Sequence, residues 1–446
     1  MHPFNPAPLR PGHPKLSRVW PVLSLLVLTA GLSACGGSSS SSSASVRLVN
    51  ATLTHPSLDL WANAALAQSA TALDSVSAYA QPTSGSASLQ VDDAGLTTAL
   101  STVSSALVGD GHYALVAYES GGAVNAATVQ EDWPLPATGA ATLRVTDFAQ
   151  EAGKLDVYVT TAPVAQAANV AALSPVGTLL PSVAGAALSL TFGPGSYYVA
   201  VTASGNPTDV RMMNMPVTLT NQEVANALLT PATGGQLLNG SLLVQQGSYS
   251  AFRNTGTRVR LASAVSGNAT VAASATSAGS TTTIDSGSVA PQFDSYTLVP
   301  ASSALNISVN GASVSTPATA LVKGGDMTLL VYGAPDSSVA TLLTDDNRPP
   351  ADATMVKLRL INGITGNSAN MLALTANSAS VASAIAPAAA STYAAVAGSA
   401  NPMTLSFSSN QKSGIYFSDS SHVLNAGGVF TVLAVGDFSA PFLLIR

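Results

Sequence analysis

One short strand pattern recurs four times along the 446-residue chain, and this repetition constrains the fold more than any other feature. The copies are "VRLVN" (46–50), "LRVTD" (143–147), "VRLAS" (259–263) and "LRLIN" (358–362). Apolar residues alternate with an arginine, so a β-strand buries the apolar side chains on one face and turns the arginine to the other. The four arginines, Arg47, Arg144, Arg260 and Arg359, are spaced by 97, 116 and 99 residues. The spacing predicts four similar units.

Two further patterns recur downstream of these strands. A serine, a tyrosine, a turn and an alternating strand follow one another in "SAYAQPTSGSASLQV", "SYTLVPASSALNISV" and "STYAAVAGSANPMTLSF". Nearer the end of each unit, a glycine turn leads into an apolar strand in "GDGHYALVAYESG", "KGGDMTLLVYGAP" and "AGGVFTVLAVGDF". The second unit departs here, with the longer "NQEVANALLTPATGGQLLNGSLLV".

Units of about 100 residues with short alternating strands and frequent turns favour an all-β fold of tandem antiparallel, immunoglobulin-like β-sandwiches. We predict sandwich units at 46–139, 140–255, 256–350 and 351–446. Two alanine-rich stretches, 62–73 and 163–173, are predicted to form short helices in loops, because alanine has the highest helix propensity.

Prolines mark two of the junctions, in "WPLP" (133–136) and "NRPPAD" (347–352), where they stop strands and stiffen the chain. If the units are separate sandwiches, few contacts cross these junctions. A fragment of residues 351–446 is then expected to fold by itself, in one cooperative transition.

The paired opening "VRLVNA…LDLW", repeated at about 100 residues in an exported chain, resembles the domain of unknown function family 4397. The resemblance covers most of residues 46–446 and is clearest in the first two units. It implies a β-sandwich and a location in the bacterial envelope, and it transfers no catalytic residue.

The N-terminus has the layout of an export signal. Residues 1–18 carry Arg10, Lys15 and Arg18 without an acidic residue, and about fourteen apolar residues follow. This apolar run is shorter than the ~20 residues that span a bilayer, as in a signal peptide. The motif Leu32-Ser33-Ala34-Cys35 resembles a bacterial lipobox. The resemblance implies cleavage of a signal peptide of residues 1–34, a diacylglycerol on the sulfur of Cys35 and an acylated N-terminus.

The single cysteine of the chain excludes an intrachain disulfide, so the exported units must be stable through their cores alone. Residues 35–45 are predicted to form the lipidated cysteine and a flexible Gly/Ser tether. The residue after Cys35 is Gly36 rather than aspartate. By resemblance to lipoproteins of two-membrane bacteria, this implies sorting to the outer membrane.

Composition limits the partners. Only 9% of the residues are charged, the formal net charge is −6, and removal of residues 1–34 removes three positive charges. No basic cluster is present, so we expect no nucleic-acid partner. The predicted partners are the membrane, through the lipid anchor, and an envelope protein or glycan ligand. We expect no cofactor.

Four charged residues and two aromatic residues are weak candidates for recognition. Arg47 and Asp59 are twelve residues apart, as are Arg144 and Asp156. Each pair is predicted to form a cross-strand ion pair that sets register, with a recognition or ion-binding point as the alternative. Trp61 and Tyr158, two residues from an aspartate and on its face, either pack across strands or offer a stacking surface for a sugar ring.

Searches for catalytic motifs return no GxSxG elbow, HExxH, P-loop, GxGxxG or EF-hand loop. His55, His112 and His422 lie apart in the sequence and read as residues of surface turns. The favoured hypothesis is a non-enzymatic, lipid-anchored envelope protein that is structural, adhesive or ligand-binding. The alternative is an extracytoplasmic hydrolase, for example carbohydrate-active, that uses carboxylates from different units.

Overall fold

Thirty-four strands and three short 3-10 helices make up the regular structure of residues 42–181 and 185–446, which a computed structural model describes. Within these residues the all-β prediction is confirmed. The predicted signal peptide (1–34) and Cys35 lie outside the described residues. None of the helices in the described residues is long and apolar enough to cross a membrane. Residues 42–446 are grouped as one compact unit.

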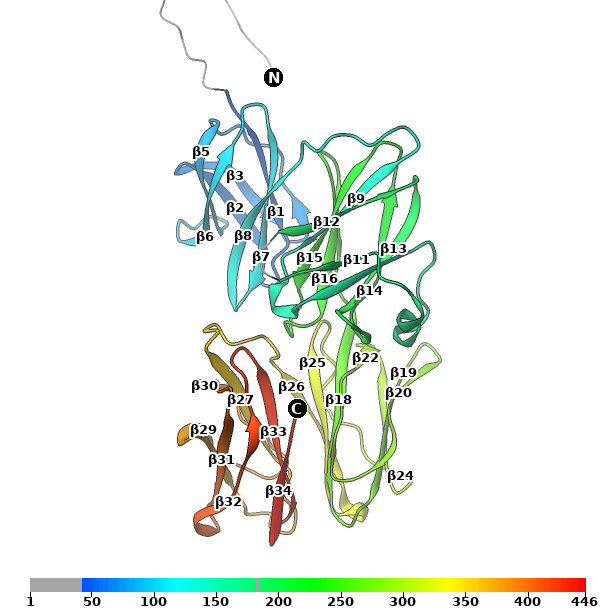
Figure 1. The fold of residues 1–446 in the computed structure, drawn as a ribbon, viewed down its shortest axis with the longest axis vertical. Helices are drawn as coiled ribbons and strands as arrows, with labels where there is room; N and C mark the ends of the chain where they lie inside the picture. Colours follow the sequence, from blue (N-terminus) through cyan, green and yellow to red (C-terminus); the bar gives the residue numbers. More distant parts are fainter. Residues whose placement is uncertain (1–41, 182–184) are drawn as a thin grey trace, which may run out of the picture. The chain divides into compact units, whose positions relative to one another are not determined.

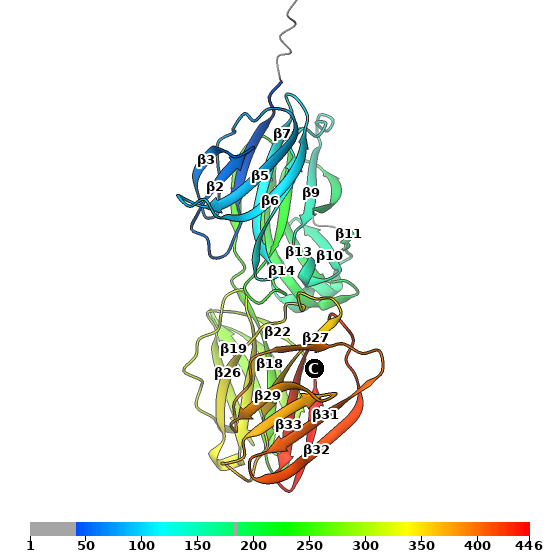
Figure 2. The same ribbon diagram turned by 90° about the vertical axis from the view of Figure 1, so that its left-hand side faces the viewer.

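The strands group into four two-sheet sandwiches in chain order (Figures 1 and 2). Sandwich 1 has sheets of order β4-β1-β7-β8 and β3-β2-β5-β6. Its strands are β1 Ser45–Asn50, β2 Ser57–Ala62, β3 Ala65–Ala72, β4 Ser75–Val76, β5 Gly85–Asp93, β6 Ala99–Leu107, β7 His112–Ser120 and β8 Ala123–Gln130.

Sandwich 2 has sheets of order β12-β9-β15-β16-β17 and β11-β10-β13-β14. Its elements are β9 Ala141–Asp147, η1 Gln150–Ala152, β10 Leu155–Thr160, η2 Ala167–Ala172, β11 Gly177–Leu179, β12 Ala186–Phe192, β13 Gly195–Ala203, β14 Asn206–Leu219, β15 Val224–Pro231, β16 Leu238–Val244 and β17 Tyr249–Phe252.

Sandwich 3 has sheets of order β21-β18-β25-β26, with β22 also on β18, and β20-β19-β23-β24. Its elements are β18 Gly256–Val265, β19 Thr270–Ser277, β20 Ser280–Val289, β21 Gln292–Phe293, β22 Thr297–Pro300, β23 Ala304–Val309, β24 Ala312–Ser313, β25 Asp326–Gly333, η3 Pro335–Ser337 and β26 Val339–Asp345.

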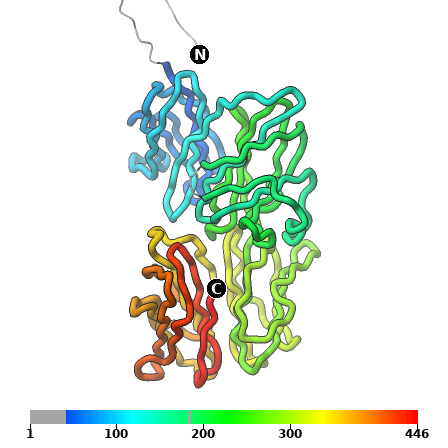
Figure 3. Tube along the Cα trace, viewed as in Figure 1, coloured from blue at the N-terminus to red at the C-terminus, as the bar shows by residue number. Residues whose placement is uncertain are grey.

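Sandwich 4 has sheets of order β30-β27-β33-β34 and β29-β28-β31-β32. Its strands are β27 Met355–Asn362, β28 Leu372–Ala376, β29 Ala379–Ile385, β30 Ala394–Ala397, β31 Pro402–Ser409, β32 Lys412–Val423, β33 Val429–Asp437 and β34 Ala440–Ile445. The chain completes each sandwich before it starts the next, as the colour order of the trace shows (Figure 3).

The repeats found in the sequence occupy equivalent places in the four sandwiches. The strand with the arginine comes first (β1, β9, β18 and β27), and it pairs in parallel with the later apolar strand (β7, β15, β25 and β33). The remaining ladders between strands are antiparallel, as predicted. In sandwich 2, β15 takes the place of the glycine-led repeat, although its sequence differs.

Each sandwich buries its own hydrophobic core between its two sheets. In β1, Val46 and Leu48 enter the core while Arg47 points to the other face, which is the predicted alternation. The core reaches back into the predicted tether, because Ala44 is fully buried and β1 begins at Ser45. The predicted domain boundaries stay a prediction.

Two apolar clusters join neighbouring sandwiches through the outer faces of their sheets. Val49 and Val116 of sandwich 1 meet Leu228 and Leu243 of sandwich 2. A second cluster of buried residues joins sandwiches 3 and 4: Ala262, Ala264, Phe293, Leu330, Ile361, Leu433 and Val435. The expectation that few contacts cross the junctions is therefore wrong. The strand face opposite the core is covered by a neighbouring sandwich in both clusters.

The predicted alanine-rich helices are only partly present. Residues 65–72 form strand β3, in which pairing with β2 overrides the helix propensity of alanine. Residues 167–172 form the 3-10 helix η2, which places Val170 in a buried cluster.

The shared cluster changes the expectation for the isolated fragment 351–446. Its own core is complete, so we expect a cooperative urea transition followed by circular dichroism. Its outer face would expose Ile361, Leu433 and Val435, so we also expect self-association, measured by sedimentation. A fragment of residues 256–446 is the control, because it keeps that face covered. A monomeric fragment 351–446 as stable as the control would contradict the packing described here.

Candidate functional site

The arginine of each first strand stacks on an aromatic ring from elsewhere in the chain. Arg47 Cζ lies 5.0 Å from the ring centroid of Tyr79, and Arg359 Cζ lies 4.9 Å from that of Tyr393. Arg260 is 4.5 Å from the ring centroid of Tyr296. These tyrosines belong to the recurring Ser/Tyr segments, which run beside the first strand. Ala80 bridges Val46 of β1, β22 pairs with β18, and β30 pairs with β27.

In three of these pairs the arginine also binds a carboxylate from the end of a sandwich: Glu131 in one pair and Asp345 in two. Glu131 follows β8 and binds Arg47, whose Nε donates to its Oε2 over 2.8 Å; Tyr79 donates its hydroxyl to the same oxygen. Both residues of this ion pair are almost completely buried, so the pair is a structural element of the interior. Arg47 also donates to the carbonyls of Val244 and Gly247 in sandwich 2.

Asp345, the last residue of β26, lies between two arginines of different sandwiches. It pairs with Arg260 over 3.3 Å and with Arg359, and its side chain is fully buried. Burial disfavours the charge on Arg359, but Asp345 outweighs this effect and raises the pKa of Arg359. Arg260 and Arg359 each also donate to both Thr328 and Thr431, so the contacts are nearly symmetric between sandwiches 3 and 4.

The predicted ion pairs Arg47–Asp59 and Arg144–Asp156 are wrong. Consecutive strands β1 and β2, like β9 and β10, lie in opposite sheets of a sandwich, so their outer faces point apart. Asp59 instead accepts hydrogen bonds from the backbone N–H groups of Ala70 and Gly95. Both donors have positive φ angles, so the carboxylate fixes two left-handed residues: Ala70 at an irregularity inside β3, and Gly95 in the turn after β5.

Asp156 has the equivalent role in sandwich 2. It accepts from the hydroxyl of Thr178 over 2.6 Å and from the N–H of Gly205 over 2.8 Å. Burial opposes ionisation of Asp156, yet these hydrogen bonds outweigh it and lower its pKa. The repeated aspartate therefore binds the glycine of one hairpin turn in each sandwich, Gly95 between β5 and β6 and Gly205 between β13 and β14.

The two aromatic candidates differ in their surroundings. Tyr158 is 3% exposed and packs with Val170, Ala200 and Val210, in agreement with the first of the two alternatives, packing across strands. Trp61 is half-buried on the outer face of β2, beside Asp59, and its indole N–H has no partner among the described residues. A recognition role for these residues stays a prediction.

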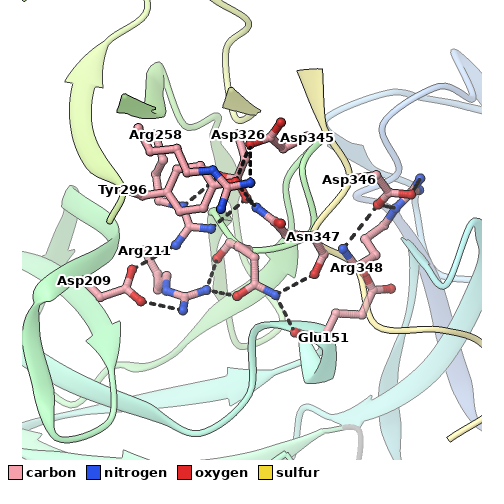
Figure 4. A network of polar contacts seen from close by, with 12 residues as sticks. Glu151, Asp209, Arg211, Arg258, Tyr296, Asp326, Asp345, Asp346, Asn347 and Arg348 are labelled. Carbon is pink, nitrogen blue, oxygen red and sulfur yellow. Dashed lines mark hydrogen bonds and ion pairs between the residues drawn. The ribbon is translucent and has the colours of Figure 1, made fainter. Parts of the chain in front are cut away.

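A second set of buried polar residues joins sandwiches 2 and 3 (Figure 4). Arg258 donates two hydrogen bonds of 2.7 Å to the carboxylate of Asp326 and a third, of 2.9 Å, to Asp209. Asp209 also pairs with Arg211 over 2.8 Å. Burial, and next the charge of Arg258, lower the pKa of Arg211. Asn347 extends the network from the proline junction by donating to Asp326.

A cavity of about 430 Å³ opens beside this network. Residues of sandwiches 1 and 4 and of the proline junction line it. Asp346, Arg348, Lys357 and Tyr393 supply its polar groups. Arg348 and Lys357 both pair with Asp346, over 2.7 and 2.9 Å. Burial opposes ionisation of Asp346, but hydrogen bonds from these two cations outweigh it and lower its pKa to about 2. The volume is that of a small-ligand pocket, with its charges paired internally.

Each of the three predicted surface-turn histidines lies close to one carboxylate. His55 Nδ1 lies 2.6 Å from Asp93, and His112 Nδ1 lies 3.1 Å from Asp132. His422 is 3.7 Å from Asp419. No group of three potential metal ligands occurs among the described residues.

The strand arginines and the Ser/Tyr segments were found in the sequence as two separate repeats. That the arginine of one contacts the tyrosine of the other was not predicted. Glu131, Asp345, Arg211 and Arg258 were not singled out. The signal that could have found two of them is the shared end of units 1 and 3, "EDWPLP" and "DDNRPP", in which acidic residues precede the prolines.

Comparison with known proteins gives one family and several distant structures. None of the curated proteins matches the chain. A candidate cell adhesion protein from Bacteroides uniformis is 11% identical, with 47% of this chain and 99% of that chain covered and a TM-score of 0.20. The Bacillus anthracis TIE protein is 8% identical, with 63% and 47% covered and a TM-score of 0.14, so this chain spans about half of that structure.

A C-terminal fragment of the pilus adhesin SpaC from Lactobacillus rhamnosus GG is 12% identical, with 47% and 97% covered and a TM-score of 0.10. The strand pairing within each sandwich defines its fold. Residues 44–158, which contain sandwich 1, β9 and most of β10, match the family model "Domain of unknown function (DUF4397)". The family resemblance predicted from the sequence repeats is therefore confirmed for this segment of the chain.

Proposed function

We propose that this chain is a lipid-anchored protein of the bacterial cell envelope, whose four sandwiches form a non-enzymatic array that binds a partner at a distance from the membrane. The observation that carries the proposal is that three arginines on first strands each bind groups of two sandwiches at once. Arg47, Arg258 and Arg359 each contact a neighbouring sandwich as well as their own. Such contacts hold successive sandwiches to one another, as a spacer or adhesive stalk requires.

The charged groups support a binding role over a hydrolytic one. Glu131, Asp345 and Asp326 each accept hydrogen bonds from an arginine and are almost completely buried. A carboxylate buried in this way cannot reach a glycosidic bond as a catalytic acid or base.

The function is tested with the purified mature chain, residues 35–446. We expect labelled protein to bind envelope preparations in a saturable way, and we expect no turnover of polysaccharide or ester substrates. Turnover that a single carboxylate substitution abolishes would establish the hydrolase instead.

The anchor is tested separately, through Cys35. We expect Cys35→Ser to leave the precursor unprocessed and to move the protein from the membrane to the soluble fraction, because a serine cannot accept the thioether-linked lipid. Cell fractionation and the mass of the protein give the result, with Ser33→Ala as a control that keeps the cysteine. We expect the wild-type protein in the outer membrane, because Gly36 rather than aspartate follows the cysteine. Retention of Cys35→Ser in the membrane would contradict the anchor.

A further inference from the structure

Arg144 differs from the other three strand arginines in having no carboxylate. Its Cζ lies 3.7 Å from the ring centroid of Trp133, the shortest of the cation–π contacts among the described residues. No ion pair or hydrogen bond joins its guanidinium to any described residue, and its Nε is buried without a partner. The residues outside the described ranges, 1–41 and 182–184, include no aspartate or glutamate.

The sequence explains the missing carboxylate. In sandwiches 1 and 3 the acidic residue comes at the end of the last strand, as Glu131 and Asp345. Sandwich 2 ends with β17 and the residues "YSAFRNT" (249–255), which contain no acidic side chain. The aromatic half of the motif is kept, and the acidic half is absent.

The guanidinium of Arg144 remains accessible. The residue is half-buried, and its two terminal nitrogens make no hydrogen bond to the part of the chain that the structure describes. Burial alone lowers the pKa of Arg144, with no carboxylate to offset it. A guanidinium stacked on an indole has a fixed plane, and its two open N–H groups suit a bidentate carboxylate.

We propose that Arg144, stacked on Trp133, is a binding site for an Asp or Glu carboxylate of an acidic polypeptide segment of a partner protein. The chain itself supplies the precedent, because its other strand arginines bind carboxylates at the end of the last strand of a sandwich, Glu131 directly after β8 and Asp345 at the end of β26. The assignment rests on the proposed binding function. Enzymatic turnover would contradict the proposed function, whereas a lack of peptide binding would contradict only the site at Arg144. The two failures are therefore distinguishable.

The test uses the whole chain with Trp20→Phe and Trp61→Phe, which leaves Trp133 as the single tryptophan. The probe is the hexapeptide LLTDDN, which copies residues 342–347 around Asp345, and the control peptide is LLTNNN. We expect a saturable change in Trp133 emission with LLTDDN that weakens with added salt, and no change with LLTNNN.

Three variants assign the binding to Arg144. Arg144→Gln is expected to weaken peptide binding about tenfold. Arg144→Lys keeps the positive charge but lacks the two parallel N–H donors of the guanidinium, so we expect an intermediate loss. Lys154→Gln removes an exposed positive charge from the same sandwich and is expected to bind like the parent protein. Thermal melts establish that each variant is folded.

Two results would overturn the proposal. One is the absence of saturable binding, or equal binding by Arg144→Gln and the parent protein. The other is Arg144-dependent binding of trigalacturonate without binding of the peptide, which would assign the site to an acidic glycan.

Discussion

Asp345→Ala is expected to lower the free energy of unfolding of the paired sandwiches 3 and 4 by about 3–5 kcal/mol. The substitution removes the one carboxylate that neutralises both Arg260 and Arg359, and each of these side chains is less than 5% exposed. It also removes the acceptor of the hydroxyl groups of Tyr296 and Thr328. Two buried cations would then lose their ion-pair partner, and two buried hydroxyl donors would lose their acceptor.

The neighbouring residue provides a matched control. Asp346 pairs with Arg348 and Lys357, but its side chain is 38% exposed and that of Arg348 is 39% exposed. Water replaces such partners, so we expect Asp346→Ala to lower stability by about 1 kcal/mol or less. Urea titrations followed by circular dichroism compare the two variants. Similar losses for Asp345→Ala and Asp346→Ala would show that burial of the ion pair does not decide its contribution.

The strand pattern allowed the fold class to be predicted from the sequence. Alternation in "VRLVN" correctly assigned Val46 and Leu48 to a core and Arg47 to the opposite face. A period of two distinguishes the two faces of a strand, but it does not say what covers the second face. Arg47 lies on this second face, and it is 4% exposed because sandwich 2 covers it.

The partners of the charged residues could not be predicted from their spacing. Twelve residues between Arg47 and Asp59 suggested a hairpin, in which neighbouring strands share a sheet. The connection between β1 and β2 instead crosses from one sheet to the other, and it places the two side chains on opposite outer faces. The true partner, Glu131, is 84 residues away and becomes a neighbour because β1 pairs with β7, and β7 with β8.

The departures from the repeat indicate where sandwiches differ in chemistry. Arg144 keeps the stacked ring and lacks the acid, and Asp147, three residues later, takes the place of an asparagine. Asn50 and Asn362, in the equivalent positions, each donate their side-chain amide to two backbone carbonyls. Asp147 cannot donate in this way while it is ionised.

The surroundings of Asp147 disfavour its charge. The residue is fully buried; Oδ1 accepts from the N–H of Ala149 over 2.7 Å, and Oδ2 has no partner among the described residues. Burial raises the pKa of Asp147 from 3.8 to about 6, and the hydrogen bond from Ala149 offsets only part of this effect. The folded protein therefore holds this proton more tightly than the unfolded chain does.

The expected consequence is a loss of stability as the pH rises from about 4 to about 6. Between these values the folded state binds more protons at Asp147 than the unfolded state, so the free energy of unfolding falls with rising pH. A shift from 3.8 to about 6 corresponds to about 3 kcal/mol, fully lost above pH 6. Asp147→Asn has no charge to bury, so it is expected to be more stable than the wild type by up to about 3 kcal/mol at pH 7 and nearly equal at pH 4.

Urea titrations of wild type and Asp147→Asn at pH 4, 5, 6 and 7 measure this difference directly, because the other titrating groups are common to both proteins. Asp336→Asn, at an exposed aspartate of η3, controls for the loss of one negative charge. A difference that grows between pH 4 and 6 and then stays constant identifies the buried carboxyl as its source. If Asp147→Asn instead lowers stability by the same amount at every pH, the ionised carboxylate of Asp147 is itself a favourable element of sandwich 2, and the assignment of a raised pKa to this residue is wrong.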